Sequence, residues 1–361
     1  MSAALKEKTV SITPRDAAPV PPLAAKVAFL RRPEAYAFAV KEIVARETHM
    51  SWVFLAGERV IKLKKPVRFP YLDFSTLARR EAACRAELTL NRRLAPGVYD
   101  AVVPLVQGSG GLAIGGQGEI VDWLVSMRRL DESRTLEHAL LTRQLSASQV
   151  EHLVATLIAF YNRAERLPVC PAAHLRDWRR SLAFNRAVLL DARLGLPAGL
   201  IRAIDRVQSR FLERNAALIL DRVRGRHIVN GHGDLRPEHI FLTDPIRIID
   251  CLEFNARLRA VDPFDEIAFL CLECERLGGG FAADAIRRGI AKGLRDGLSH
   301  ALFLFYRCHR ATLRARLAIA HLLEDHPRTP EKWPALARTY LQFAARDAAS
   351  LRRLIRRRGD R

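Results

Sequence analysis

Residues 231–255 read GHGDLRPEHIFLTDPIRIIDCLEFN and contain two aspartates, Asp234 and Asp250, on either side of a short hairpin pattern. The apolar segments HIFL and IRIID have the composition of short strands, and TDP between them is a turn signal. A hairpin would bring the two carboxylates together. Carboxylates at close range share a proton or a cation, whereas separate turn aspartates only cap the local backbone. The neighbours of the pair favour the first interpretation: they are His232, Gly233 and Pro237.

A lysine-bearing strand is expected far upstream of this pair. Lys62 stands between apolar neighbours in RVIKLKKP, and Lys64 shares its face because side chains alternate along a strand. The helical segment that follows, residues 75–95, carries Glu81 and Glu87, and either glutamate can pair with a strand lysine. Phosphoryl transfer uses this set of residues: a lysine on the phosphates, a glutamate that orients it, a carboxylate base and a carboxylate that holds magnesium.

The character of the chain changes near residue 131. The preceding segments predict short strands, and the following ones predict long amphipathic helices, so the fold class is α+β with a small antiparallel β lobe before a larger helical lobe. A helix is expected over 24–47, a hairpin over 51–65, and two strands around a glycine-rich turn at 108–118. Long helices are expected at 146–167, 175–196, 198–223 and 302–325.

The composition limits the class of protein. The formal net charge is +20, with 50 arginines and nine lysines. This charge indicates either an arginine bias spread over solvated surface or binding to polyanions. The sequence has no recognised nucleic-acid motif, and aromatic residues make up only 7%. No specific nucleic-acid partner is therefore expected.

Cysteine usage and hydropathy predict a cytoplasmic protein without a membrane partner. Cys271 and Cys274 form a CxxC pattern inside an apolar helical run, and no second pair completes a metal set, so they are expected to be packed thiols. Unpaired cysteines are typical of a reducing compartment. No apolar run reaches the length of a membrane span.

The sequence resembles the aminoglycoside phosphotransferase family, which are small-molecule kinases with the protein-kinase-like fold, and in particular a bacterial branch of that family. The family signature HGDxxxxN appears as His232-Gly233-Asp234 with His239 at its last position. The metal-binding aspartate after the hairpin matches Asp250 in IIDCLEF, and a DPxxDLA-like run appears as DPFDEIA at 262–268. ETHMSWVFLAGERVIKLKKP and AELTLNRRLAP also resemble that branch, so the likeness covers roughly residues 24 to 345.

This resemblance implies a division of the chain and roles on its catalytic side. Residues 1–23 are a flexible leader, 24–130 a nucleotide-binding lobe with a hinge, and 131–361 a helical lobe with the catalytic loop and the acceptor site. Asp234 is the catalytic base, and His232 and Arg236 belong to the same loop. Asp250 and His239 occupy the positions of the metal ligands, for Mg²⁺ or Mn²⁺.

The resemblance also implies a nucleotide site for ATP. Lys62 would contact the phosphates, with Glu87 as its partner. Glu87 is preferred to Glu81 because it stands seven residues before Leu94, as the glutamate of the family stands before its leucine. The other implied nucleotide contacts are Ser51 beside the phosphates and Met127 and Arg129 beside the adenine. Three choices remain open: Lys62 or Lys64 on the strand, Glu87 or Glu81 on the helix, and ATP or GTP as the nucleotide.

Two positions depart from the family pattern. His239 replaces an asparagine that supplies an oxygen to magnesium, and imidazole is better suited to softer metals. His239 is therefore a ligand of a metal such as Mn²⁺, a structural side chain of the loop, or a sign of a degenerate kinase. Glu266 replaces an aspartate, and the adjacent Asp265 is expected to compensate by tightening the loop.

Three functions follow from these features. The first is an ATP-dependent kinase that acts on a hydroxyl of an unidentified small molecule, and the second is a nucleotide-binding pseudokinase with a regulatory role. The third, a basic nucleic-acid-binding protein, has the least support. The charge of the acceptor and the oligomeric state remain open.

Overall fold

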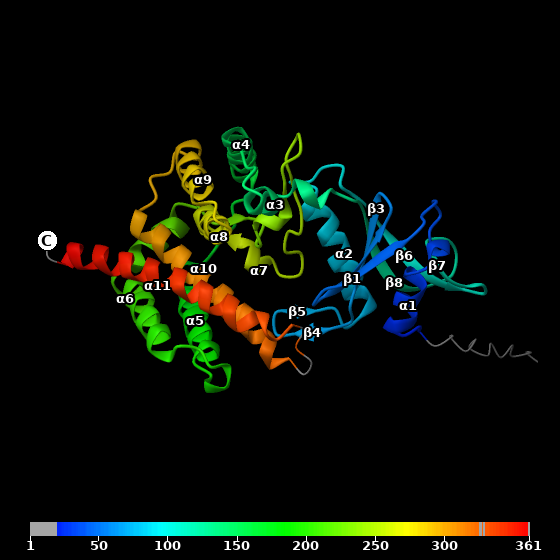
Figure 1. The fold of residues 1–361 in the computed structure, drawn as a ribbon, viewed down its shortest axis with the longest axis horizontal. Helices are drawn as coiled ribbons and strands as arrows, with labels where there is room; N and C mark the ends of the chain where they lie inside the picture. Colours follow the sequence, from blue (N-terminus) through cyan, green and yellow to red (C-terminus); the bar gives the residue numbers. More distant parts are fainter. Residues whose placement is uncertain (1–19, 325–326, 328, 360–361) are drawn as a thin grey trace, which may run out of the picture.

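The structure is a computed structural model that describes residues 20–324, 327 and 329–359. Most of the expected leader, residues 1–23, therefore lies outside the described residues. The first lobe is a six-stranded antiparallel sheet in the order β1-β2-β3-β8-β6-β7 (Figure 1). Its strands are β1 Ile43–Glu47, β2 Ser51–Ala56, β3 Arg59–Lys64, β6 Tyr99–Gly108, β7 Gly111–Ile114 and β8 Glu119–Arg128.

Alternating apolar side chains bury both faces of this sheet. Ile61 and Leu124 point to a core shared with α1 (Leu23–Leu30), whereas Val60 and Val125 point to a core shared with α2 (Leu77–Asn91). Because successive side chains of a strand lie on opposite faces, neighbouring residues of β3 and β8 enter different cores. The predicted hairpin at 51–65 is confirmed as β2 and β3, in which Val53 pairs with Lys62.

Two expectations for this lobe are wrong. The helix expected over 24–47 ends at Leu30, and Ile43–Glu47 forms β1, in which Ile43 pairs with Ala56 of β2. The turn expected at 108–118 contains the strand β7, which pairs with β6 in a tight hairpin. In both places backbone pairing with a neighbouring strand outweighs local preference, which is common for strands. The long helix predicted at 75–95 is confirmed as α2, and the Thr76 side chain caps its first turn.

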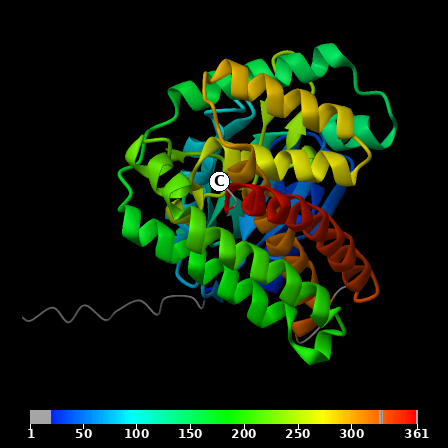
Figure 2. The same ribbon diagram turned by 90° about the vertical axis from the view of Figure 1, so that its left-hand side faces the viewer.

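The second lobe is helical, as expected. Its helices are α3 Leu136–Leu141, α4 Ala147–Arg163, α5 Pro171–Leu189, α6 Ala198–Arg224, α7 Ala256–Arg259, α8 Pro263–Arg276, α9 Gly280–Gly293, α10 His300–Ala320 and α11 Lys332–Gly359, with short 3-10 turns η1 Pro33–Ala35, η2 Glu132–Arg134, η3 Ala192–Leu194, η4 Pro237–His239 and η5 His321–Leu323. α5 packs along α6, and α10 packs along α11 (Figure 2). α8 is buried almost throughout its length, and Cys271 and Cys274 are packed thiols inside it.

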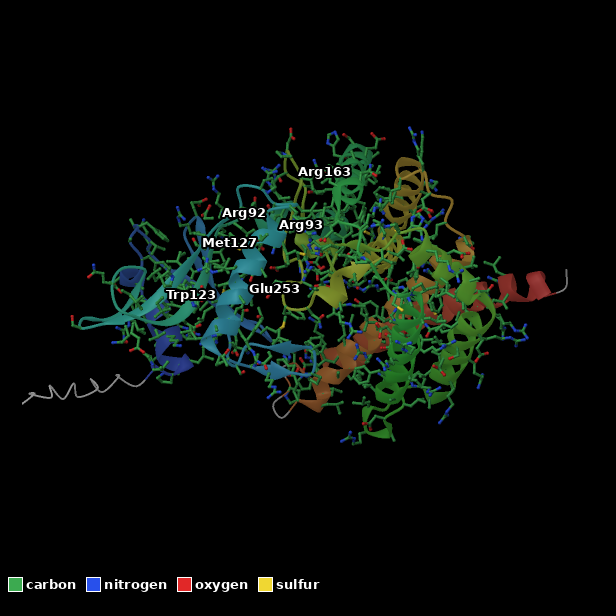
Figure 3. All side chains as sticks on the ribbon, turned by 180° about the vertical axis from the view of Figure 1, so that it is seen from behind. Arg92, Arg93, Trp123, Met127, Arg163 and Glu253 are labelled. Carbon is green, nitrogen blue, oxygen red and sulfur yellow. The ribbon has the colours of Figure 1, made fainter. Side chains whose placement is uncertain are left out.

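Short strand pairs position the site between the lobes. β10 (Ile240–Phe241) pairs with β11 (Arg247–Ile248), which confirms the predicted hairpin between the two aspartates. β9 (Val229–Asn230) pairs with β12 (Ala260–Val261), and β4 (Arg68–Phe69) pairs with β5 (Leu72–Asp73). Arg93 of the small lobe also contacts this region, because its guanidinium donates to the carbonyl oxygens of Asn230 and Gly231 at 2.7 Å each (Figure 3). Within the described residues, no helix is long and apolar enough to cross a membrane.

Candidate active site

A cavity of about 620 Å³ lies between the two lobes. Lys62, His239 and Asp250 line its polar end, and Met127 and Arg129 line the side of the segment that joins the lobes. Ser51 does not line it, whereas Thr48 does, and the backbone N–H of Ser51 donates to Thr48 Oγ1. Apolar side chains from both lobes also line the cavity, namely Val53, Leu55, Val60, Leu130, Phe241 and Ile249. Polar side chains such as Glu137, His138 and Glu238 complete its lining.

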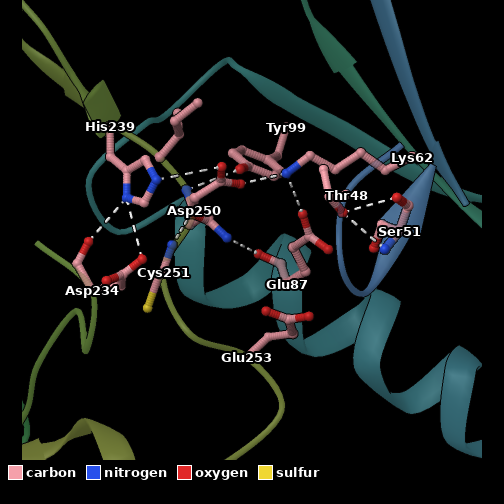
Figure 4. Close-up of polar contacts among 12 residues, drawn as sticks. Thr48, Ser51, Lys62, Glu87, Tyr99, Asp234, His239, Asp250, Cys251 and Glu253 are labelled. Carbon is pink, nitrogen blue, oxygen red and sulfur yellow. Dashed lines mark hydrogen bonds and ion pairs between the residues drawn. The ribbon is translucent and has the colours of Figure 1, made fainter. Parts of the chain in front are cut away.

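A chain of ion pairs runs from this cavity into the small lobe, and Figure 4 shows its first members, Lys62, Glu87 and Asp250. Lys62 Nζ contacts Glu87 Oε1 at 3.0 Å and also the carboxylate of Asp250. Lys64 Nζ contacts the other oxygen of Glu87 at 2.7 Å and Glu253 Oε1 at 2.5 Å. Burial alone would lower the pKa of both lysines, but the carboxylates outweigh it and raise their pKa. Both lysines therefore bear a charge, and the one that faces the cavity is Lys62.

The ambiguity between the two helix glutamates is resolved by their positions. Glu87 is buried against the lysines, whereas Glu81 forms an exposed pair with Arg85 on the same helix. The prediction that Glu87 pairs with a strand lysine is confirmed. Glu253 was not predicted, although it stands only three residues after Asp250 in IIDCLEF.

Asp250 is held in an uncommon backbone conformation. Its φ is +59°, a left-handed value that aspartate tolerates better than most residues. The N–H of Asp250 donates to the Tyr99 hydroxyl at 3.3 Å, and the N–H of Cys251 donates to Asn91 Oδ1 at 2.9 Å. Burial raises the pKa of the Asp250 carboxyl, but Lys62 outweighs it and leaves the pKa well below its usual range. Asp250 is thus an ionised, oriented carboxylate.

The Glu266 side chain holds the backbone of the loop that carries Asp234. The Glu266 carboxylate accepts the backbone N–H of His232 at 3.1 Å, the N–H of Gly233, and the Tyr161 hydroxyl at 3.0 Å. Gly233 has a φ of +89°, and a Cβ there would lie 2.9 Å from Leu252 Cδ1. A side chain at this position would therefore be both strained and crowded.

The expectation that Asp265 compensates for the glutamate is wrong. Asp265 binds Arg310 through two hydrogen bonds of 2.8 and 2.6 Å, so it does not reach the loop backbone. The longer side chain of Glu266 itself spans the gap to the loop. No room remains beneath it, because a Cβ on Gly231 would lie 2.6 Å from Glu266 Oε2.

His232 links the loop to the hairpin and does not line the cavity. Its ring contacts the carbonyl oxygen of Ile249 through Nε2 at 2.9 Å and the N–H of Asp234 through Nδ1 at 3.3 Å. Since a carbonyl can only accept and an amide N–H can only donate, Nε2 carries the proton and Nδ1 accepts. Burial lowers the pKa of His232 to about 3, which keeps this ring neutral.

His239 lies between the two aspartates. Its Nδ1 is 2.9 Å from the carbonyl oxygen of Asp234, and its Nε2 is 3.2 Å from the Arg236 guanidinium. Because a guanidinium has no acceptor, Nε2 must accept and Nδ1 must carry the proton. The nearest carboxylate oxygens are 3.8 Å away on Asp234 and 3.9 Å away on Asp250. The hairpin thus brings the two carboxylates to either side of one imidazole ring.

Arg236 also acts on Asp234 directly. Its Nε donates to Asp234 Oδ2 at 3.0 Å. Burial raises the pKa of the Asp234 carboxyl, but the charges of Arg236 and Arg314 outweigh it and leave the pKa below its usual value. Asp234 Oδ1 makes no hydrogen bond within the described part of the chain, so one carboxylate oxygen is free to accept a proton donor.

The side chains around Asp234 and Asp250 suit a hard cation such as Mg²⁺ only in part. Within the described residues, no three His, Cys, Asp or Glu side chains form a group that could hold a metal ion. Mg²⁺ needs no such cage, because one or two carboxylates and the phosphate oxygens of a substrate commonly hold it. The Asp250 carboxylate fits this role. His239 fits it poorly, because its lone pair accepts from Arg236.

A second cavity, of about 640 Å³, lies outside this arrangement. It is lined by the β4–β5 hairpin, by small side chains of α2 and by Glu253 and Phe254. None of the predicted site residues lines it.

Comparison with known proteins agrees with this geometry. A sequence model of the phosphotransferase enzyme family matches residues 71–303. Uncharacterized proteins of Mycobacterium tuberculosis and Mycobacterium bovis are each 33% identical over 292 residues, which is 79% of this chain and 56% of theirs. The chain thus spans little more than half the length of these curated relatives.

Solved structures share the fold at low sequence identity. A thermostable mutant of the aminoglycoside phosphotransferase APH(4)-Ia superposes with a TM-score of 0.51 and 11% identity, over 86% of this chain and 96% of that one. A mutant of aminoglycoside 2'-phosphotransferase-IIIa in complex with GDP superposes with a TM-score of 0.50 and 14% identity, over 87% and 93%. The protein-kinase-like fold is thereby confirmed, and the chain belongs to the phosphotransferase enzyme family.

Proposed function

We propose that the protein is an ATP-dependent phosphotransferase that acts on a hydroxyl of a small molecule. The observation that carries this proposal is the Lys62–Glu87 ion pair at 3.0 Å, whose lysine lines the cavity together with Asp250 and His239. His239 lies 3.8 Å from Asp234 and 3.9 Å from Asp250. Phosphoryl transfer depends on the positioning of phosphates and on the stabilisation of charge, and these residues supply both.

ATP would bind with its purine between the apolar walls of the cavity and its phosphates at the polar end. An ammonium group has three donors, and Lys62 uses two of them on Glu87 and Asp250. The third donor is free for a phosphate oxygen. Met127 and Arg129 would lie beside the purine ring, and Thr48 is better placed than Ser51 to reach the phosphates.

Asp250 would hold Mg²⁺ together with phosphate oxygens. The bound cation would neutralise charge on the β- and γ-phosphates. His239 is better suited to a structural role, since its two nitrogens hold Arg236 and the carbonyl of Asp234 in register. We therefore expect Mg²⁺ to serve and no preference for Mn²⁺ to arise from this ring.

Asp234 would act as the base. The acceptor oxygen forms a bond to the γ-phosphorus while the bond from that phosphorus to the β–γ bridging oxygen breaks. The electron pair of the broken bond leaves with ADP, and the hydroxyl proton passes to Asp234 Oδ1. The low pKa of this carboxyl keeps it ionised at neutral pH, so it can orient the hydroxyl from the start.

A thermal-shift titration with ATP, with and without Mg²⁺, tests the nucleotide site. A ligand at a hundredfold excess over its dissociation constant stabilises the native state by about 2.7 kcal/mol. We expect a metal-dependent shift that Asp250→Asn abolishes and Asp234→Ala retains. ADP release in the presence of acceptor candidates should disappear in Asp234→Ala.

The outcomes separate the alternatives. A metal-independent shift without ADP release would favour a nucleotide-binding pseudokinase. The absence of any nucleotide-induced shift would refute the proposed activity. His239→Asn should leave the choice between Mg²⁺ and Mn²⁺ unchanged, whereas loss of a Mn²⁺ preference in this variant would identify the ring as a ligand.

A further inference from the structure

Helix α10 carries four arginines, and three of them are held by acids. Arg307 binds Asp347 at 2.8 and 2.5 Å. Arg310 binds Asp265 at 2.8 and 2.6 Å, and Arg314 contacts Glu273 at 3.1 Å. These pairs tie α10 to α8 and α11. The fourth arginine, Arg316, has a different environment.

Arg316 has no acidic partner among the described residues. Its guanidinium lies over the ring of Phe184 at 4.4 Å from the centroid. Its Nε is shielded from solvent and, within the described part of the chain, makes no hydrogen bond. Burial lowers the pKa of Arg316. A buried donor without a partner costs about 1–3 kcal/mol, and native proteins retain few of them.

The side of α10 that carries Arg316 faces α5, and other unsatisfied groups lie there. Among the described residues, His309 Nδ1 and Asn185 Oδ1 are also buried without a hydrogen-bond partner. His309 contacts Ser181 through its other nitrogen at 2.8 Å, and Phe184 of the same helix α5 is 57% exposed. The contact between α5 and α10 therefore contains buried polar atoms that the described residues leave without hydrogen-bond partners.

α10 is joined to the loop that carries the proposed base. Arg310 binds Asp265 at 2.8 and 2.6 Å, and the neighbouring Glu266 accepts the backbone N–H of His232 at 3.1 Å. Arg316 follows Arg310 by six residues, less than two turns further along α10.

The β4–β5 hairpin of the small lobe carries Tyr71. Burial raises the pKa of Tyr71, and the charge of Arg316 opposes this effect. The carbonyl oxygen of Tyr71 accepts from Asn255 Nδ2 at 3.4 Å, so the hairpin is joined to the segment that follows Asp250. Glu324, the carboxylate that also acts on Tyr71, contacts His321 at 2.7 Å.

We propose that Arg316 binds an anionic group of the acceptor, a carboxylate or a phosphate monoester, while Asp234 receives its hydroxyl. The inference rests on the proposed function and narrows its acceptor to hydroxylated small-molecule anions. A guanidinium donates two parallel hydrogen bonds to such groups and is less strongly hydrated than an ammonium. The acceptor would supply the partner that the described residues do not supply.

A binding measurement tests this inference without turnover. The thermal midpoint is followed at constant ionic strength as inorganic phosphate or acetate replaces chloride, with the nucleotide site saturated by a non-hydrolysable ATP analogue and Mg²⁺. We expect phosphate, acetate or both to stabilise the wild type, and Arg316→Met to abolish the response. Arg206→Met, which removes an exposed charge on α6, is the matched control. Equal responses in all three proteins would overturn the proposal.

An acceptor screen gives the second readout. Pairs of hydroxylated compounds that differ only in carrying an anionic or an ammonium group are compared by ADP release. We expect the anionic members to be phosphorylated, with a KM about 10- to 100-fold higher in Arg316→Met, partial recovery in Arg316→Lys and little change in kcat. Preference for the ammonium members would contradict the proposal. ATP-induced stabilisation should be equal in the wild type and Arg316→Met, and its absence from both would count against the phosphotransferase and not against the anion site.

Discussion

Replacing each strand lysine by methionine should separate stability from activity. Lys64 is 2% exposed and lies between two buried carboxylates, Glu87 and Glu253. Lys64→Met leaves Glu253 without its partner, and burial already raises the pKa of that carboxyl while Lys64 is present. Removal of one partner from a buried ion pair typically costs 3–5 kcal/mol. We expect Lys64→Met to lower the free energy of unfolding by about 3 kcal/mol or more.

Lys62→Met should behave in the opposite way. Glu87 keeps Lys64 as a partner, and the Asp250 side chain is 40% exposed, so water can solvate the charge that is left. The expected loss of stability is therefore only about 1 kcal/mol. The phosphates, however, lose a charged donor at the polar end of the cavity. Loss of one such donor commonly lowers kcat by about 10²- to 10³-fold.

Urea unfolding and phosphoryl transfer, measured on the same preparations, provide the assay. Lys65→Met is the control, because Lys65 pairs with the partly exposed Glu47 at 2.9 Å and is not in the buried chain. The turnover of Lys64→Met is measured where the variant is fully folded, and should then stay within about tenfold of the wild type. If Lys62→Met is the less stable of the two variants, or if Lys64→Met is the less active one, the assignment of the two lysines is refuted.

Three further predictions concern the loop that carries the base and the buried histidines. Glu266→Gln should lower the free energy of unfolding by about 2–4 kcal/mol and reduce kcat, because an amide NH₂ would face a backbone N–H. Tyr161→Phe should lower the free energy of unfolding by only about 1 kcal/mol. Equal effects of the two variants in chemical denaturation would contradict this prediction. Gly233→Ala should reduce kcat with ATP binding retained, because its φ of +89° and the contact with Leu252 oppose a Cβ; an unchanged rate would show that the loop can relax. Burial lowers the pKa of His309 to about 3. Below about pH 6.5 the unfolded chain therefore binds a proton that the folded protein does not bind, and the free energy of unfolding falls by up to about 1.4 kcal/mol per pH unit as the pH drops toward 3. His309→Gln should flatten this slope in urea unfolding measured as a function of pH.

The parts of the site that are close in sequence could be predicted. Asp234, the β10–β11 hairpin and Asp250 span seventeen residues, and a hairpin has few ways to arrange its ends. The lysine strand and the helix with Glu87 follow from strand alternation and helical period, which are local properties. The choice between Glu81 and Glu87 required the tertiary structure, since both glutamates lie on α2 and only packing decides which one is buried.

Partners from distant elements could not be predicted. Tyr99 and Asn91 hold the backbone of Asp250 and Cys251, and Arg93 holds the strand before the loop of Asp234. Asn91 and Arg93 lie in the segment AELTLNRRLAP, but hydrogen bonds to main-chain groups leave no pattern that identifies these two residues as partners of the loop. The strands β1 and β7 were missed for a similar reason: their backbone is specified by a neighbouring strand.

The substitution at position 239 shows how a residue can depart from a family pattern while the geometry of the site is retained. An asparagine at the end of the HGDxxxxN signature would supply an oxygen to the metal. His239 supplies none, but its N–H binds the carbonyl of Asp234 and its lone pair binds Arg236, whose Nε in turn binds the Asp234 carboxylate. A closed ring of hydrogen bonds thus orients the proposed base. Under the proposed function, magnesium would depend on Asp250 and on the phosphates of the nucleotide, which would make its affinity without nucleotide weak and couple metal binding to ATP binding.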